Sequence, residues 1–136
     1  DFSYVCLDQQ YSRVNTPQSV LELAQSCNHG NLQDHELKLR LHRALFGQQM
    51  WDKRCDTLSG GERMRLCLCS LMIANHVPDL FVLDEPTNNL DLSSLAILTR
   101  TVRNYRGTLL VVSHDDNFTR EIGITRTVGL ESPPAE

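Results

Sequence analysis

The sequence lacks the features that mark membrane, nucleic-acid-binding or secreted proteins. No apolar run approaches the roughly 18 residues that cross a bilayer, and no charged-then-apolar leader opens the chain. Its 13 Lys and Arg residues against 17 Asp and Glu give a net charge of −4 without a basic cluster. This balance disfavours a nucleic-acid or lipid surface. We therefore expect a cytoplasmic protein with no membrane segment.

Cysteine is present, but not in a pattern that indicates disulfides or a metal site. The five cysteines are odd in number and scattered, and the one close pair, Cys67 and Cys69, matches no common zinc spacing. We expect buried free thiols in a reducing compartment. The chain is 136 residues long, which is enough for about one domain.

From position 58 onward, helical and apolar segments alternate. The runs LFVLD (80–84) and GTLLVVSH (107–114) contain continuous apolar stretches, which is typical of parallel strands covered on both faces. A strand, a helix and a second strand over about thirty residues make a βαβ unit. The pattern predicts an α/β fold with a mostly parallel sheet flanked by helices.

The first 57 residues read as one strand followed by a helical subdomain. The expected elements there are a strand at 3–7, a helix over 18–27 opened by Thr16 and Pro17, and a helix over 34–46 stopped by Gly47. Further elements are expected as helices at 60–75 and 93–104, a short helix after Asp115 and a strand at 125–130. We predict three parts: 1–57, a core half at 58–130, and a disordered tail at 131–136.

The segment LSGGE (58–62) places two glycines at the start of a helix, where glycine is unfavourable. Ser59 and Glu62 have the spacing of a capping box, so the segment is explained in part as a helix start. A capping box does not require Gly60 and Gly61. Missing side chains at a helix amino terminus allow a phosphate to reach the free N–H groups, so we expect an anion site there.

Two adjacent carboxylates follow the strand at 80–84. Asp84 is placed to organise a magnesium ion, and Glu85, one residue further, is placed to take a proton from water. The alternative is an acidic pair that only caps the turn at Pro86 and Thr87. Ligands of open parallel sheets bind beyond the carboxyl ends of the strands, which favours the chemical role.

The strand at 107–114 also ends in a polar cluster. His114 lies at its carboxyl end, where it is placed to contact a phosphate or an attacking water, although a single histidine is more often structural. Gln9 follows the first strand and is a weaker candidate for binding the metal or positioning water. If the strands are neighbours, Asp84, Glu85 and His114 share one edge of the sheet.

Together these segments resemble the nucleotide-binding domain of ATP-binding-cassette (ABC) proteins. LSGGE matches the family's signature motif, LFVLDEP (80–86) the Walker B strand, and NNLD (88–91) the D-loop. VVSHD (111–115) resembles the switch-histidine strand, and LDQ (7–9) stands where the Q-loop belongs. The segments DEPTNNLD and YRGTLLVVSHD are most similar to the ABC-F subfamily, soluble cassette pairs of which many act on the ribosome.

The resemblance implies an ATPase that works at the interface of two cassettes. In it Asp84 supports Mg²⁺, Glu85 polarises the attacking water and His114 contacts the γ-phosphate. Gln9 senses the metal and water, and Asp91 couples the two sites. The signature residues close over ATP held by the other cassette; they are Ser59, Gly60, Gly61 and Glu62.

Two departures qualify this resemblance. ABC-F chains usually carry an Arg where this sequence has Asp116, whereas Phe118 fits the subfamily. No G-x-x-x-x-G-K-[ST] phosphate loop (Walker A) occurs in the sequence. We therefore expect the carboxyl-terminal part of a cassette that does not hydrolyse ATP by itself. A transporter cassette, or a non-catalytic interaction module with the same fold, remains an alternative.

Overall fold

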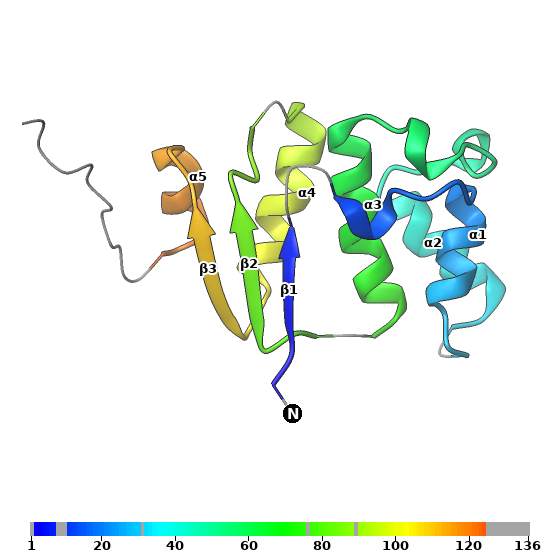
Figure 1. The fold of residues 1–136 in the computed structure, drawn as a ribbon, viewed down its shortest axis with the longest axis horizontal. Helices are drawn as coiled ribbons and strands as arrows, with labels where there is room; N and C mark the ends of the chain where they lie inside the picture. Colours follow the sequence, from blue (N-terminus) through cyan, green and yellow to red (C-terminus); the bar gives the residue numbers. More distant parts are fainter. Residues whose placement is uncertain (1, 8–10, 31, 76, 89, 125–136) are drawn as a thin grey trace, which may run out of the picture.

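The computed structural model contains a small parallel β-sheet flanked by helices (Figure 1). It describes residues 2–7, 11–30, 32–75, 77–88 and 90–124. The strands are β1 (Tyr4–Leu7), β2 (Leu80–Asp84) and β3 (Thr108–Val112), all parallel and in this spatial order. The predicted α/β fold is confirmed. Gln9, the predicted strand at 125–130 and the predicted tail at 131–136 lie outside the described residues.

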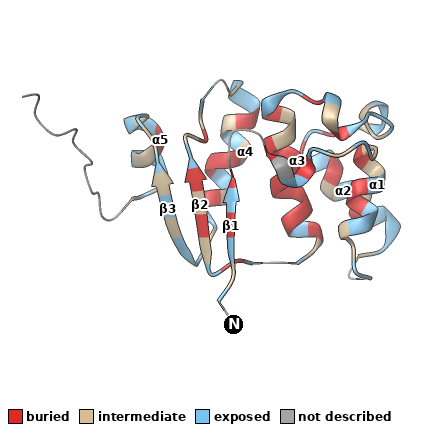
Figure 2. Ribbon diagram, viewed as in Figure 1, coloured by how far each residue is buried: buried red, intermediate tan, exposed pale blue. Residues whose placement is uncertain are grey.

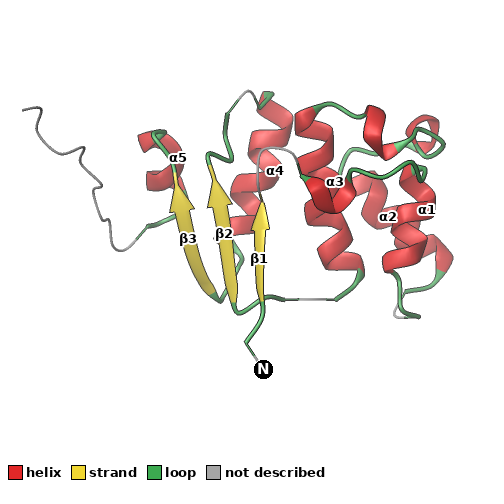
Figure 3. Cartoon of the chain, in the orientation of Figure 1, coloured by secondary structure: helices red, strands yellow, loops and turns green. Residues whose placement is uncertain are grey.

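The helices are α1 (Val20–Cys27), α2 (Asp34–Arg43), α3 (Gly60–Ile73), α4 (Leu92–Arg103) and α5 (Asp116–Glu121), with short 3-10 helices η1 (Ser12–Val14), η2 (Gln48–Met50) and η3 (Cys55–Thr57). Helices α1, α2 and α4 gather around α3, whereas α5 follows β3 (Figure 3). Helix α3 contacts α1, α2 and α4. Within the described residues, no helix has the length and hydropathy of a membrane span.

Helix α3 is the centre of the hydrophobic core. From Met64 to Leu71 every residue is buried, as the apolar run after its first turn predicts (Figure 2). Partners come from the other helices and from alternate strand residues such as Leu7, Phe81 and Leu83. An apolar helix of this kind is stable only when it is covered on most sides.

The sheet is covered on one face only by the described residues, so the prediction of strands buried on both faces is wrong. Val5 and Phe81 are buried towards the helices, whereas Tyr4, Leu110 and Val112 are exposed on the other face. The alternation follows from the pleat, which points successive side chains to opposite faces. The apolar sequence is suited to strands that are covered on both faces, but the described helices cover only one face.

Helix α1 begins later than the sequence analysis predicted. Its N-cap is Ser19, whose hydroxyl accepts a hydrogen bond from the Glu22 amide at 3.1 Å, while the Glu22 carboxylate accepts from the Ser19 amide at 3.0 Å. Thr16 and Pro17 precede the helix. The reciprocal capping box satisfies two backbone N–H groups, which the Thr16 cap would not do.

Helix α2 ends before Gly47, and Leu45 takes the left-handed position that the sequence analysis assigned to the glycine. Leu45 has φ of 68°, whereas Gly47 has φ of −72°. The Phe46 amide donates to the Leu41 carbonyl at 2.8 Å, and the Leu45 amide donates to the His42 carbonyl at 2.9 Å. This closure buries Phe46 completely, which offsets the strain at Leu45.

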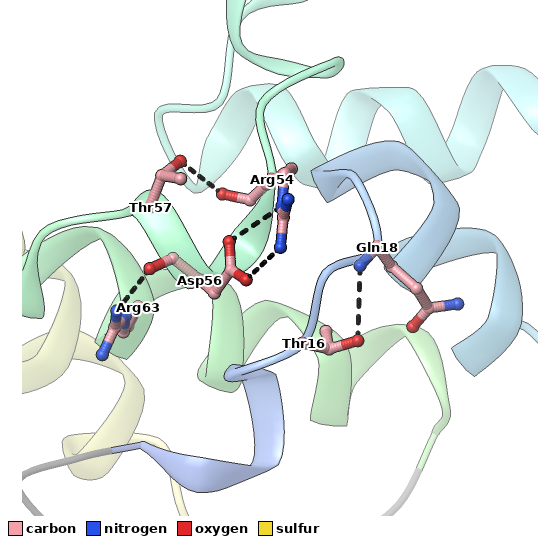
Figure 4. A network of polar contacts seen from close by, with 6 residues as sticks. All are labelled: Thr16, Gln18, Arg54, Asp56, Thr57 and Arg63. Carbon is pink, nitrogen blue, oxygen red and sulfur yellow. Dashed lines mark hydrogen bonds and ion pairs between the residues drawn. The ribbon is translucent and has the colours of Figure 1, made fainter.

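The turn that leads into α3 is tied to the segment that leads into α1 by backbone hydrogen bonds, in which the Asp56 amide donates to the Thr16 carbonyl at 3.1 Å. Figure 4 shows side-chain contacts within each of the two segments. The Arg54 guanidinium binds both carboxylate oxygens of Asp56, at 3.1 and 2.6 Å. Arg63, in the first turns of α3, donates to the Asp56 carbonyl at 2.8 Å. These hydrogen bonds fix the loop that precedes α3 and join it to the first turns of the helix.

We predict that Leu45→Gly stabilises the protein by about 0.5–1 kcal/mol, because glycine adopts a positive φ without the penalty of a side chain. The matched control is Leu39→Gly. Leu39 is 47% exposed and Leu45 48%, but Leu39 lies inside α2. The Leu39→Gly variant should therefore be less stable than the parent chain by about 1 kcal/mol. Urea unfolding measures both, and a loss of stability in Leu45→Gly would contradict the assignment of strain.

Candidate functional site

The polar residues that follow β2 and β3 meet at one edge of the sheet. The two strands are parallel neighbours, with Asp84 paired to Val112 in the register. Beyond their ends, the His114 Nε2 atom lies 3.5 Å from the Glu85 Oε1 atom. The expectation that these clusters share an edge is confirmed. The His114 side chain is 98% exposed, so it is open to a ligand from solution.

Glu85 has a backbone conformation that is rare for a residue with a side chain. Its φ is 47°, in the left-handed region. The Glu85 amide donates to the Val112 carbonyl at 2.7 Å, and its carbonyl accepts from the Asn88 amide at 3.3 Å. These bonds extend the β2–β3 pairing by one residue and hold the turn. A strained, over-determined conformation at a strand end is the kind found where a side chain must be aimed at a ligand.

The donor chemistry of Asp84 and Glu85 fits a magnesium ion. Asp84 is exposed, and both residues offer carboxylate oxygens at the same strand end. Among the described residues no group of three or more His, Cys, Asp or Glu side chains is arranged as a metal cage. Mg²⁺ does not need one, because it keeps several waters and is usually held by one or two carboxylates together with phosphates.

The amino terminus of α3 has the predicted capping box. The Ser59 hydroxyl accepts from the Glu62 amide at 3.2 Å, and the Glu62 carboxylate accepts from the Ser59 amide at 2.9 Å. The amides of Gly60 and Gly61 have no acceptor within the described part of the chain. Two free N–H groups at the positive end of a helix dipole can bind a phosphate.

The two glycines of this turn have different surroundings. A Cβ atom on Gly61 would lie 2.7 Å from Asp91 Oδ1 and 3.0 Å from Ser94 Oγ, whereas one on Gly60 would meet nothing within 4 Å. Gly61 is therefore required by the close approach of α4. Packing within the chain is thus a sufficient reason for glycine at position 61, and the expectation that both side chains were removed for a phosphate stays a prediction. Gly60 is exposed and leaves an open approach.

Asp91 is the N-cap of α4. Its carboxylate accepts a hydrogen bond from the Ser94 amide at 3.2 Å. Hydrogen bonding by Ser94 lowers the pKa of Asp91 below its ordinary value. A lowered pKa means that the charged cap stabilises the fold at neutral pH and ceases to do so as the pH falls through that pKa. Because a Cβ atom at Gly61 would meet its carboxylate, the predicted D-loop residue lies beside the signature turn of the same chain.

Sequence reasoning did not identify Arg65 as part of the site. The Arg65 guanidinium is buried and donates to Ser94 Oγ at 3.0 Å and to the Ala44 carbonyl at 2.8 Å. It also lies over the Phe46 ring, 5.1 Å from the centroid. Arg65 therefore holds α3, the start of α4 and the end of α2 together. A charged residue inside an otherwise apolar helix was the available signal.

The cysteines are only partly as expected. Cys55, Cys67 and Cys69 are buried and Cys27 is half-buried, but Cys6 is exposed on β1, so the prediction of buried thiols is wrong for Cys6 and holds only in part for Cys27. Burial raises the pKa of Cys69 to about 12 and that of Cys55 to about 11. Both are therefore protonated and unreactive at neutral pH. No disulfide forms among the described cysteines.

We predict that Gly61→Ala destabilises the protein by about 1–3 kcal/mol, because the added methyl group overlaps two side chains that cannot move freely. Asp91 is held by its cap and Ser94 by Arg65. Gly60→Ala is the control and should be close to neutral. Equal unfolding midpoints in urea for the two variants would show that α4 does not approach Gly61 this closely.

Comparison with known proteins identifies the family. The model of the family described as ABC transporter matches residues 4–88. The energy-dependent translational throttle protein EttA of Haemophilus influenzae is 37% identical over 117 residues, which are 85% of this chain and 20% of that protein. ABC transporter F family member 5 of Arabidopsis thaliana is 40% identical over 96 residues, 71% of this chain and 13% of that protein.

Solved structures agree on the fold. The dimeric, post-hydrolysis ATP-binding cassette MJ0796 bound to ADP and Pi is 21% identical with a TM-score of 0.63, over 88% of this chain and 56% of that one. RNase-L inhibitor is 24% identical with a TM-score of 0.65, over 90% of this chain and 24% of that one. The chain spans about a fifth of the EttA sequence. The motifs, the parallel sheet and these matches together show that the chain belongs to the ABC family, with F-subfamily members among its relatives.

Proposed function

We propose that this chain is the carboxyl-terminal part of an ATP-binding cassette in an ABC-F type ATPase that acts in translation, in the cytoplasm. The observation that carries the proposal is the pairing of Glu85 and His114 across two neighbouring strand ends, with 3.5 Å between Oε1 and Nε2. The name of the translational throttle protein EttA supports the role in translation, and the F-family relatives favour this reading over a transporter cassette.

In this mechanism Glu85 accepts a proton from the water that attacks the γ-phosphate. Its left-handed backbone sets the direction in which the side chain leaves the turn, and the carboxylate lies beside His114, so the base is already positioned near the phosphate contact. His114 donates a hydrogen bond to the γ-phosphate from the adjacent strand end. Asp84 would hold Mg²⁺ through its waters, and Gln9 would contribute to the same site. Bound Mg²⁺ neutralises charge on the transferred phosphoryl group.

The signature turn serves ATP bound by a second cassette, as in a head-to-tail pair. Gly60 and Gly61 offer backbone N–H groups, and the Ser59 hydroxyl keeps its own hydrogen free to donate while it accepts from Glu62. The Glu62 carboxylate stays in the capping box and fixes the turn. Asp91 touches this turn and so couples its position to α4. The predicted boundary between the helical subdomain (1–57) and the core half (58–130) is part of this proposal, because the signature turn begins at residue 58.

We predict that Glu85→Gln, in the two-cassette protein that contains this chain, lowers kcat for ATP hydrolysis by roughly 10²–10⁴-fold, which is the usual contribution of a positioned base. Gln keeps the size of the side chain and removes its basicity. Glu121→Gln, an exposed change on α5, is the control and should leave kcat unchanged. Near-full activity of Glu85→Gln in a phosphate-release assay would exclude Glu85 as the base.

We predict that the 136-residue chain by itself has no measurable ATPase activity and little affinity for ATP. The sequence has no G-x-x-x-x-G-K-[ST] loop, so it lacks the backbone cradle and lysine that bind the β- and γ-phosphates. Isothermal titration calorimetry with Mg-ATP measures this. Binding in the micromolar range would contradict the prediction and show that the signature turn is a sufficient site.

A further inference from the structure

A groove of about 760 Å³ lies between α2, α3 and α4; Arg65 and Ala44 are among its lining residues, whereas Ser59, Glu85 and His114 are not. It follows the carboxyl-terminal half of α3 and reaches Phe81, at the start of β2, and Arg106, just before β3. Glu85 and His114 follow the opposite ends of the same strands. The groove is therefore at the other edge of the sheet from the candidate site, and along α3 its lining begins at Arg65, after the signature turn.

The groove has a strongly positive rim. Arg40 and Arg43 contribute from α2, Arg100 from α4, and Arg106 from the turn before β3. No Asp or Glu lines it, and none of these four guanidinium groups has an ion-pair partner within the described part of the chain. Four unpaired arginines around one hollow repel each other, and this cost is relieved by a bound anionic group.

The floor of the groove is apolar. Leu68 and Phe81 are buried beneath it, and Ile97 of α4 closes one side. Two large apolar side chains stand exposed at its margin, Met72 at 51% and Val77 at 70%. Exposed apolar groups beside a concave surface favour a partner that brings apolar side chains of its own.

We propose that this groove binds an acidic amphipathic peptide segment of a partner protein. The apolar face of such a segment would lie on the floor, and its Asp and Glu side chains would pair with the arginine rim. Charge complementarity selects an acidic partner. The apolar floor favours a peptide over RNA, whose phosphates would use the rim and leave Met72 and Val77 uncovered. Arginine suits this role because it pairs bidentately with carboxylates and also covers apolar surface.

The test is fluorescence anisotropy of a fluorescein-labelled synthetic peptide, titrated with the full chain in the absence of nucleotide. The peptide is an amphipathic helix with Glu on one face and Leu and Phe on the other, and a scrambled peptide of the same composition is compared. We expect saturable binding of the amphipathic peptide, at least tenfold tighter than the scrambled one. Because no ATP is present, the result is independent of the proposed ATPase function.

Charge-reversal variants locate the site. Arg43→Glu and Arg100→Glu should each weaken peptide binding roughly tenfold, since each replaces an attraction by a repulsion. Arg13→Glu and Arg120→Glu carry the same charge change at exposed positions outside the groove, and they should bind like the parent chain. Val77→Ser tests the apolar contact without disturbing the core and should weaken binding several-fold.

Three outcomes would overturn the proposal. One is equal affinity for the amphipathic and scrambled peptides, or no binding of either. The second is an equal loss of affinity in the charge-reversal variants inside the groove and in those outside it, which would indicate a diffuse charge effect. The third is tighter binding of a single-stranded RNA oligonucleotide that is insensitive to Val77→Ser, which would assign the arginines to phosphates.

Discussion

The buried guanidinium of Arg65 is the interaction on which the arrangement of helices depends. A cation inside a core is costly unless its donors are satisfied. Arg65 meets this condition by donating to Ser94 and to the Ala44 carbonyl, and by lying over the Phe46 ring. Ser94 lies at the start of α4, and Ala44 lies at the end of α2. The arginine thus fixes three helices at one point and brings α4 against the signature turn.

The contacts of Arg65 position one part of the candidate site, the signature turn. The carboxyl ends of β2 and β3 position the other part. The parallel pairing of β2 and β3 puts Glu85 and His114 within reach of each other, and the turn after β2 leads through Asp91 into α4. Asp91 then contacts the Gly61 position at the start of α3. Asp91 thus lies between the start of α3 and the turn that leads back to Glu85.

Local signals predicted much of the fold. The strand at 80–84 and the starts of α3 and α5 follow from apolar runs and capping residues close in sequence, so they could be predicted from neighbours alone. Two helix boundaries could not. Ser19 competes with Thr16 as a cap, and Leu45 rather than Gly47 becomes left-handed because burying Phe46 outweighs the local strain. The exposed sheet face also depended on which helices were present to cover it.

The sequence by itself determined the family, the order of motifs and the chemical types at each strand end, because these depend on residue identity and spacing. The tertiary structure alone decided the 3.5 Å approach of His114 to Glu85, the left-handed backbone of Glu85 and the role of Arg65. It also gave the two signature glycines different surroundings, since Gly61 makes room for α4 whereas Gly60 faces open space. Contacts between residues distant in the chain create these properties, and no local pattern records them.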